Sequence, residues 1–315
     1  MTQEPDRESG RSDLPVSLPV WGTVVDSYRT VFIEHREHLP RALVVPLLLS
    51  LLLSLLTLHA TDFGAIKPEG LSALGAALFW RAAFAVPFVI FAVSWHRLML
   101  FGPEGGKPPL WPSLGASHLS FFGYVVLVAF VFVFFTELLA TLGIAAIVGW
   151  LPPGVDVQLG GLVGLLCSLA ASYVVVRICF VFPAAAADRA YPLADAWADT
   201  NDLQWRLFGA LFLTTLPYGL FRGLFYVVSD GNQPLSMPGA ESAASWQELA
   251  AILMANEAVM ALATYVTAAL GASLVSRVFM QRVGWKAPNG RAAPKTEPEA
   301  TAPDQKPACN PTHDA

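Results

Sequence analysis

Six long stretches of mostly apolar residues alternate with polar segments along the chain. The first contains the run VVPLLLSLLLSLL and has no charged residue between Arg41 and Asp62. A helix of about 20 residues crosses the apolar core of a bilayer, which is about 30 Å thick. The pattern therefore predicts an all-α, polytopic membrane protein whose six transmembrane helices lie at residues 41–60, 74–95, 120–147, 158–181, 207–228 and 250–278.

The segments outside the spans are of two kinds. Residues 16–39 carry apolar side chains at helical spacing with charges between them, which is typical of a helix lying in the membrane interface. Residues 1–15 and 287–315 are polar tails, and the second is rich in proline and charge, so we expect both to be disordered. Residues 16–286 are expected to form one membrane domain with cytoplasmic interfacial helices.

A similar order of residues recurs three times. The segments LPVWGTVVDSYRTVF, PPLWPSLGASHLSFF and YPLADAWADTNDLQWRLF each place a proline shortly before a tryptophan and precede a pair of spans. Each pair closes on an arginine at the end of its second span: Arg97, Arg177 and Arg277. This order predicts three helical hairpins, each with an amphipathic lead-in helix. Interface composition alone is the alternative, because Trp and Arg are enriched at membrane boundaries.

The distribution of positive charge predicts the orientation. Sixteen of the 19 Lys and Arg residues fall in the N-terminal tail, the second and fourth loops and the C-terminal tail, whereas the other loops together contain only Lys67. Short cationic loops stay in the cytoplasm. We therefore expect a multi-pass protein of the bacterial inner membrane with both termini cytoplasmic, which requires an even number of spans.

The amino-acid composition agrees with a membrane protein and argues against one class of partner. The chain is 55% apolar and 14% charged, against about 45–50% and about 25% in soluble domains. A net charge of −5 with scattered cations argues against a nucleic-acid partner. Three cysteines are too few for a disulfide framework, so we expect thiols. Membrane lipids are the expected partners, and the oligomeric state is left open.

Two longer segments carry a family resemblance. They are VVDSYRTVFIEHREHLPRALVVPLLL and RICFVFPAAAADRAYPLADAWADTNDLQWRLFGALF, and the second orders an Arg, a Pro, a polar link, an Ala-Trp helix and a Trp-Arg entry. The chain resembles uncharacterised six-span bacterial inner-membrane proteins related to the membrane domain of glycerophosphoryl diester phosphodiesterases. The resemblance implies a membrane module. We find no soluble phosphodiesterase domain in the sequence, so it implies no catalytic residues.

Four charged residues lie inside the predicted spans, where each costs at least about 2.5–3.5 kcal/mol near the bilayer centre. In the predicted orientation all four fall in the outer half of the membrane, so two positive and two negative groups could neutralise one another. A structural ion-pair network or snorkelling to the interface is one interpretation, and a polar vestibule for a substrate or proton is the other. These residues are Arg81, Glu137, Arg222 and Glu257.

The remaining candidates for chemistry are weak. The chain has one dense histidine cluster, the segment EHREH that ends at His38. Its two histidines are three residues apart, whereas zinc hydrolases of the HExxH type place them four apart. We therefore interpret the segment as a solvated helix face without a metal. His96 and His118 are expected to be ordinary surface residues. No nucleophile elbow or phosphate-binding glycine loop occurs, and no cofactor is expected.

Rows of small residues predict close helix packing within the chain, with subunit association as the alternative: Gly160 with Gly164, Gly219 with Gly223, and Ala263, Thr267 and Gly271.

The sequence therefore predicts a non-enzymatic integral membrane scaffold or accessory protein. The alternative is a small permease or transporter component that uses the outer charge cluster, and an enzyme acting on lipid comes third.

The orientation can be tested with reporter fusions. Fusions after Gly64 and Pro238 should report the periplasm, because each follows an odd number of predicted spans. Fusions after Gly105, Asp188 and Asn289 should report the cytoplasm. A periplasmic signal from the last position would contradict the six-span topology.

Overall fold

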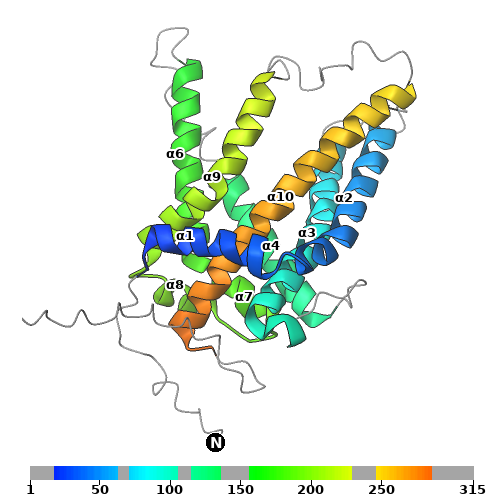
Figure 1. Ribbon diagram of the computed structural model, residues 1–315. Helices are drawn as coiled ribbons and strands as arrows, with labels where there is room; N and C mark the ends of the chain where they lie inside the picture. Colours follow the sequence, from blue (N-terminus) through cyan, green and yellow to red (C-terminus); the bar gives the residue numbers. More distant parts are fainter. Residues whose placement is uncertain (1–17, 63–70, 106–114, 136–155, 229–245, 286–315) are drawn as a thin grey trace, which may run out of the picture. The chain divides into compact units, whose positions relative to one another are not determined.

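The computed structural model describes residues 18–62, 71–105, 115–135, 156–228 and 246–285, and these ranges contain helices and no strand. The prediction of an all-α polytopic protein is confirmed (Figure 1). Both predicted disordered tails and Glu137 lie outside the described residues. The helices are α1 (Val20–Arg29), the π-helix η2 (Thr30–Glu34), α2 (His38–Asp62), α3 (Leu71–Gly105), α4 (Ala116–Val133), α6 (Asp156–Ile178), α7 (Val181–Ala186), α8 (Leu193–Asp199), α9 (Gln204–Val228) and α10 (Trp246–Val283).

Five of these helices are long and apolar enough to cross a membrane. These five helices are α2, α3, α4, α9 and α10. The predicted fourth span, residues 158–181, corresponds to α6, whose apolar part Leu162–Ile178 is shorter. The chain is therefore a multi-pass helical protein, and the count of six spans stays a prediction.

At the end of α3 the helical backbone is interrupted at Gly102, where φ is 72°, a left-handed conformation that favours glycine.

The spans pack on one another near one end. Buried side chains lie near the start of α2, α4 and α9 and near the end of α3, α6 and α10, so they meet at one level of the antiparallel helices. One hydrophobic cluster joins α1, α6, α7, α9 and α10, a second joins η2, α2, α3 and α10, and a third joins α3, α4 and α7. Towards their other ends the described spans expose large apolar residues such as Phe79, Leu166 and Leu224, as expected of surfaces that face lipid.

Polar side chains join α10 to two neighbouring spans at this packed level. The indole Nε1 of Trp95 in α3 donates to Ser273 Oγ at 2.9 Å, and Ser276 Oγ lies 2.7 Å from His96 Nδ1. The Tyr265 hydroxyl lies 2.6 Å from Ser50 Oγ in α2. Such bonds between membrane helices are worth about 0.6–2 kcal/mol each and fix which faces meet.

The lead-in helix α1 packs across the first half of α9 and the second half of α10 (Figure 1). Its Thr23, Val24 and Ser27 are buried, whereas Trp21 and Val25 are exposed. A helix is therefore present within residues 16–39, as predicted, and its buried face packs against these two spans.

Because the packed end holds the helices together, side-chain truncations in the two halves of α10 should differ in their cost. Leu274→Ala removes a fully buried side chain and should lower the free energy of unfolding by about 2–5 kcal/mol. Leu262→Ala, at a position 44% exposed, is the matched control and should cost about 0.5 kcal/mol or less. Denaturant titration in detergent micelles measures both. Equal losses would mean that the two halves of α10 are packed alike.

Candidate functional site

Arg97, at the end of the span in α3, links two segments that follow it in the chain. Its Nη1 donates to Ser117 Oγ in the first turn of α4 at 3.5 Å and to Asp188 Oδ2 after α7 at 3.4 Å. Asp188 adopts a φ of 56°, a left-handed conformation that aspartate tolerates better than most residues. The first of the three span-end arginines therefore contacts the helix that begins in the second predicted lead-in.

Arg177, in the last turn of α6, contacts the third lead-in through neutral groups. Its Nη1 donates to Asn201 Oδ1 at 3.0 Å and to Gln204 Oε1. The Trp197 ring lies over the guanidinium, with 4.4 Å from Cζ to the ring centroid. The Thr200 hydroxyl donates to the Arg177 carbonyl at 2.8 Å, so the backbone is held as well.

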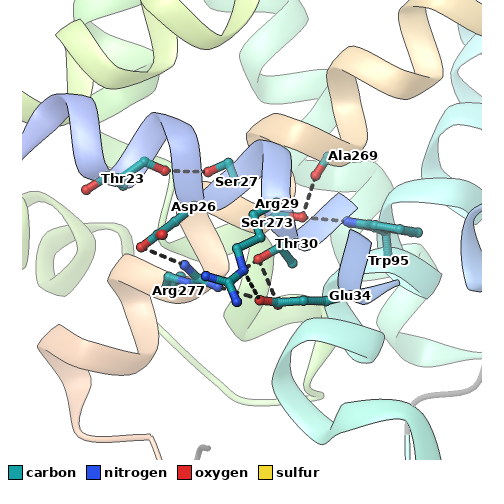
Figure 2. Close-up of polar contacts among 10 residues, drawn as sticks. All are labelled: Thr23, Asp26, Ser27, Arg29, Thr30, Glu34, Trp95, Ala269, Ser273 and Arg277. Atoms are coloured by element: carbon teal, nitrogen blue, oxygen red, sulfur yellow. Dashed lines mark hydrogen bonds and ion pairs between the residues drawn. The ribbon is translucent and has the colours of Figure 1, made fainter. Parts of the chain in front are cut away.

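Arg277 in α10 contacts the first lead-in, which lies almost the whole chain away in sequence (Figure 2). Its Nη1 lies 3.0 Å from Asp26 Oδ2, and its Nη2 donates to Thr30 Oγ1 at 2.7 Å. Glu34 Oε2 lies 3.9 Å from Nη2 and accepts a bond from the Thr30 hydroxyl at 3.1 Å. A carboxylate on each side of the guanidinium thus anchors α1 and η2 to the last span.

The three contacts follow one order. Arg97 contacts the second lead-in, Arg177 the third, and Arg277 returns to the first. A cation near a helix C-terminus also interacts favourably with the helix dipole, which suits Arg177 at the end of α6. A further pair, Arg282 Nη2 to Asp202 Oδ1 at 3.0 Å, links the end of α10 to the third lead-in. The arginines that the sequence pattern indicated are therefore the cross-links of the packed end.

The outer charges are placed differently. Arg81 and Arg222 are exposed, and Glu257 accepts a 3.5 Å bond from Ser54 Oγ. In the part of the chain that the structure describes, these three residues form no ion pair with one another. Because Glu137 lies outside the described residues, the four-charge network stays a prediction.

Helices α9 and α10 nevertheless share a polar face in the half of the spans away from the packed end. The Tyr218 hydroxyl lies 3.1 Å from Thr264 Oγ1. Arg222 follows Tyr218 by one helical turn and Glu257 precedes Thr264 by two, so each charge lies on the same side of its helix as the polar contact.

The structure corrects the interpretation of three histidine-containing features. His96 is 4% exposed, so it is not a surface residue; it packs against α10 and the Phe121 ring. EHREH is not one helix face, because η2 ends at Glu34 and α2 begins at His38. His118 is half-buried, and its Nδ1 accepts a 3.3 Å bond from the Gly115 N–H at the start of α4.

Burial lowers the pKa of a histidine in the turn between η2 and α2. Desolvation lowers the pKa of His35, and the neighbouring His38 lowers it further. The two rings are 5.9 Å apart, and the Nδ1 atom of each is buried without a hydrogen-bond partner. Among the residues that the structure describes, no group of three or more His, Cys, Asp or Glu side chains could hold a metal ion.

Sequence reasoning missed the contacts between α3 and α10. Ser276 and His96 form a buried pair that joins α10 to α3: Ser276 is 0% exposed, and its Oγ lies 2.7 Å from His96 Nδ1. The signal in the sequence was a polar side chain within each span, since such groups face another helix.

The prediction of close packing at small residues is wrong for Gly164, Gly219 and Gly223, where a Cβ atom would meet nothing within 4 Å. At Gly271 a Cβ atom would lie 3.9 Å from Leu211 of α9, so this position does pack closely within the chain.

Comparisons with protein-family models, curated proteins and solved structures found no match.

The Arg277 contacts can be tested by hydrogen exchange. Arg277→Gln should speed amide exchange across residues 20–34, because it removes the link from α1 and η2 to α10. The loss of stability should be about 1 kcal/mol or less, since the side chains are partly exposed. Arg29→Gln is the matched control, because it removes another cation from Glu34 without touching α10. Equal exchange in the two variants would contradict an anchoring role for Arg277.

Proposed function

We propose that the chain is a non-enzymatic integral membrane scaffold or accessory protein. The observation that carries this proposal is the use of the buried polar side chains. Trp95 and His96 of α3 are bonded to serines of α10, and Ser50 of α2 is bonded to Tyr265. Groups that could bind or activate a substrate are thus engaged in holding helices together.

The three arginine contacts support the same proposal. They join the lead-in segments to the ends of α3, α6 and α10, so the packed end forms a connected base. In the proposed orientation, with both termini cytoplasmic in a bacterial inner membrane, this base lies at the cytoplasmic surface. We propose three helical hairpins as the building units, in keeping with the resemblance to the phosphodiesterase-associated membrane domain.

Contacts with the surroundings would use the opposite half of the spans. Apolar side chains exposed there suit membrane lipids, and the open row of Gly219 and Gly223 on α9 would allow another helix to approach closely. An association of subunits or a membrane-protein partner would use such a face. The proposal includes no nucleic-acid partner and no cofactor.

A small permease or transporter component is the second candidate. It is favoured by the polar face of α9 and α10, where Tyr218 and Thr264 are in contact and Arg222 and Glu257 are exposed. A permease would use this face as a wet path through the outer half of the membrane.

Cysteine accessibility separates the two candidates. In a chain whose Cys167, Cys179 and Cys309 are replaced by alanine, Arg222→Cys tests the polar face. Leu224→Cys, at a position 66% exposed and closer to the predicted outer surface, is the matched control. A charged, membrane-impermeant maleimide should label position 222 no faster than position 224 if the protein is a scaffold.

The opposite result has an equally clear meaning. Faster labelling at position 222 than at position 224 requires water to reach deeper along the polar face than along the lipid-facing side. That outcome would overturn the scaffold proposal in favour of the permease.

A further inference from the structure

Arg177 differs from the other two span-end arginines in its surroundings. Arg97 has Asp188 at 3.4 Å and Arg277 has Asp26 at 3.0 Å, whereas no carboxylate pairs with Arg177 among the described residues. Arg177 is also the most buried of the three, at 3% exposure. The side chains of Arg97 and Arg277 are 40% and 32% exposed. The most buried of these three cations therefore has no acidic partner within the described part of the chain.

This arrangement leaves a buried charge without a counter-charge. Arginine does not lose its proton in proteins, so Arg177 cannot become neutral as other buried bases do. An unpaired buried charge costs several kcal/mol after relaxation. The amide oxygens of Asn201 and Gln204, the Trp197 ring and the C-terminal end of α6 offset part of that cost.

A hydrogen-bond donor is also left over. The Nε atom of Arg177 is buried and has no hydrogen-bond partner. Buried donors normally have one, and an unsatisfied group costs about 1–3 kcal/mol. The side chain thus has both a charge and an N–H that call for an anionic acceptor.

The surroundings indicate where such an acceptor comes from. Arg177 lies at the end of α6, where the Trp197 ring, 41% exposed, lies over its guanidinium. Trp205, 68% exposed, packs against Tyr173, one helical turn before Arg177 in α6. Tryptophan side chains at membrane boundaries sit at the depth of the lipid head groups. Arg206, which follows Trp205 in the chain, is exposed. Phosphate is therefore the anion available at this depth.

We propose that Arg177 binds a phosphate group at the head-group level of the membrane. The guanidinium fork donates to phosphate oxygens, as arginine does in bidentate phosphate recognition. Trp197 covers the guanidinium at the surface, and a rotation of its side chain admits the ligand. The phosphate belongs either to an acidic phospholipid or to free inorganic phosphate. The site does not depend on the scaffold role, since a permease would hold it equally well.

The most direct test introduces a carboxylate beside Arg177 by a substitution in the chain. Asn201→Asp places a carboxylate where an amide oxygen lies 3.0 Å from Nη1, with almost no change in shape. The variant should fold with an unchanged or higher melting temperature in neutral lipid. It should also lose the response to phosphate, because the internal carboxylate occupies Arg177. Gln204→Glu should act in the same way.

Thermal unfolding of the full chain in nanodiscs is the measurement. Nanodiscs of phosphatidylcholine are compared with the same nanodiscs containing phosphatidylglycerol, and with phosphatidylcholine nanodiscs in added inorganic phosphate. A rise in the wild-type melting temperature with phosphatidylglycerol alone assigns the site to a lipid phosphate. A similar rise with inorganic phosphate in neutral lipid assigns it to the free ion.

Gln281→Glu controls for the added negative charge, because it places the same charge on an exposed residue of α10. It should keep the wild-type response, while Asn201→Asp loses it. The proposal is overturned if neither phosphate source stabilises the wild type. It is also overturned if Asn201→Asp and Gln281→Glu respond alike.

Discussion

A guanidinium at the end of a membrane helix cannot shed its charge, and it must therefore find acceptors at the membrane boundary. In this protein those acceptors come from the segments that precede the pairs of spans. Arg97 and Arg277 find carboxylates, and Arg177 finds amide oxygens and an indole ring. The connecting segments are consequently held against the spans, and the lead-in helices become part of the packed end.

The hydrophobic effect contributes little between helices in lipid, so packing and polar contacts decide where the spans meet. Both are concentrated at the same end. The three hydrophobic clusters and the bonds from α10 to α2 and α3 lie at this level, beside the arginines. The opposite half exposes apolar side chains, which cost nothing in lipid. One end of the described bundle is thus fixed internally, and the other is free to contact its surroundings.

The differences among the three arginine contacts bear on function. Where a carboxylate is present, the arginine is satisfied by the chain itself and serves as a cross-link. At Arg177, the most buried of the three arginines, the acceptors within the described residues are neutral. Arg177 follows the order of the other two arginines but lacks a carboxylate partner among the described residues. An external anion would supply the missing negative charge there. The scaffold proposal and the phosphate site therefore draw on different residues.

The sequence by itself determined the helical class, the long apolar helices α2, α3, α4, α9 and α10, and the span-end arginines, because helix length and hydrophobicity are local properties of the chain. It could not supply the partners of those arginines: Asp26 lies 251 residues before Arg277, and only packing brings them to 3.0 Å. The tertiary structure also decided that His96 is buried, that EHREH is divided between η2 and α2, and that the row of Gly219 and Gly223 is open. Which face of a helix meets a neighbour depends on side chains far apart in sequence, and no local pattern records it.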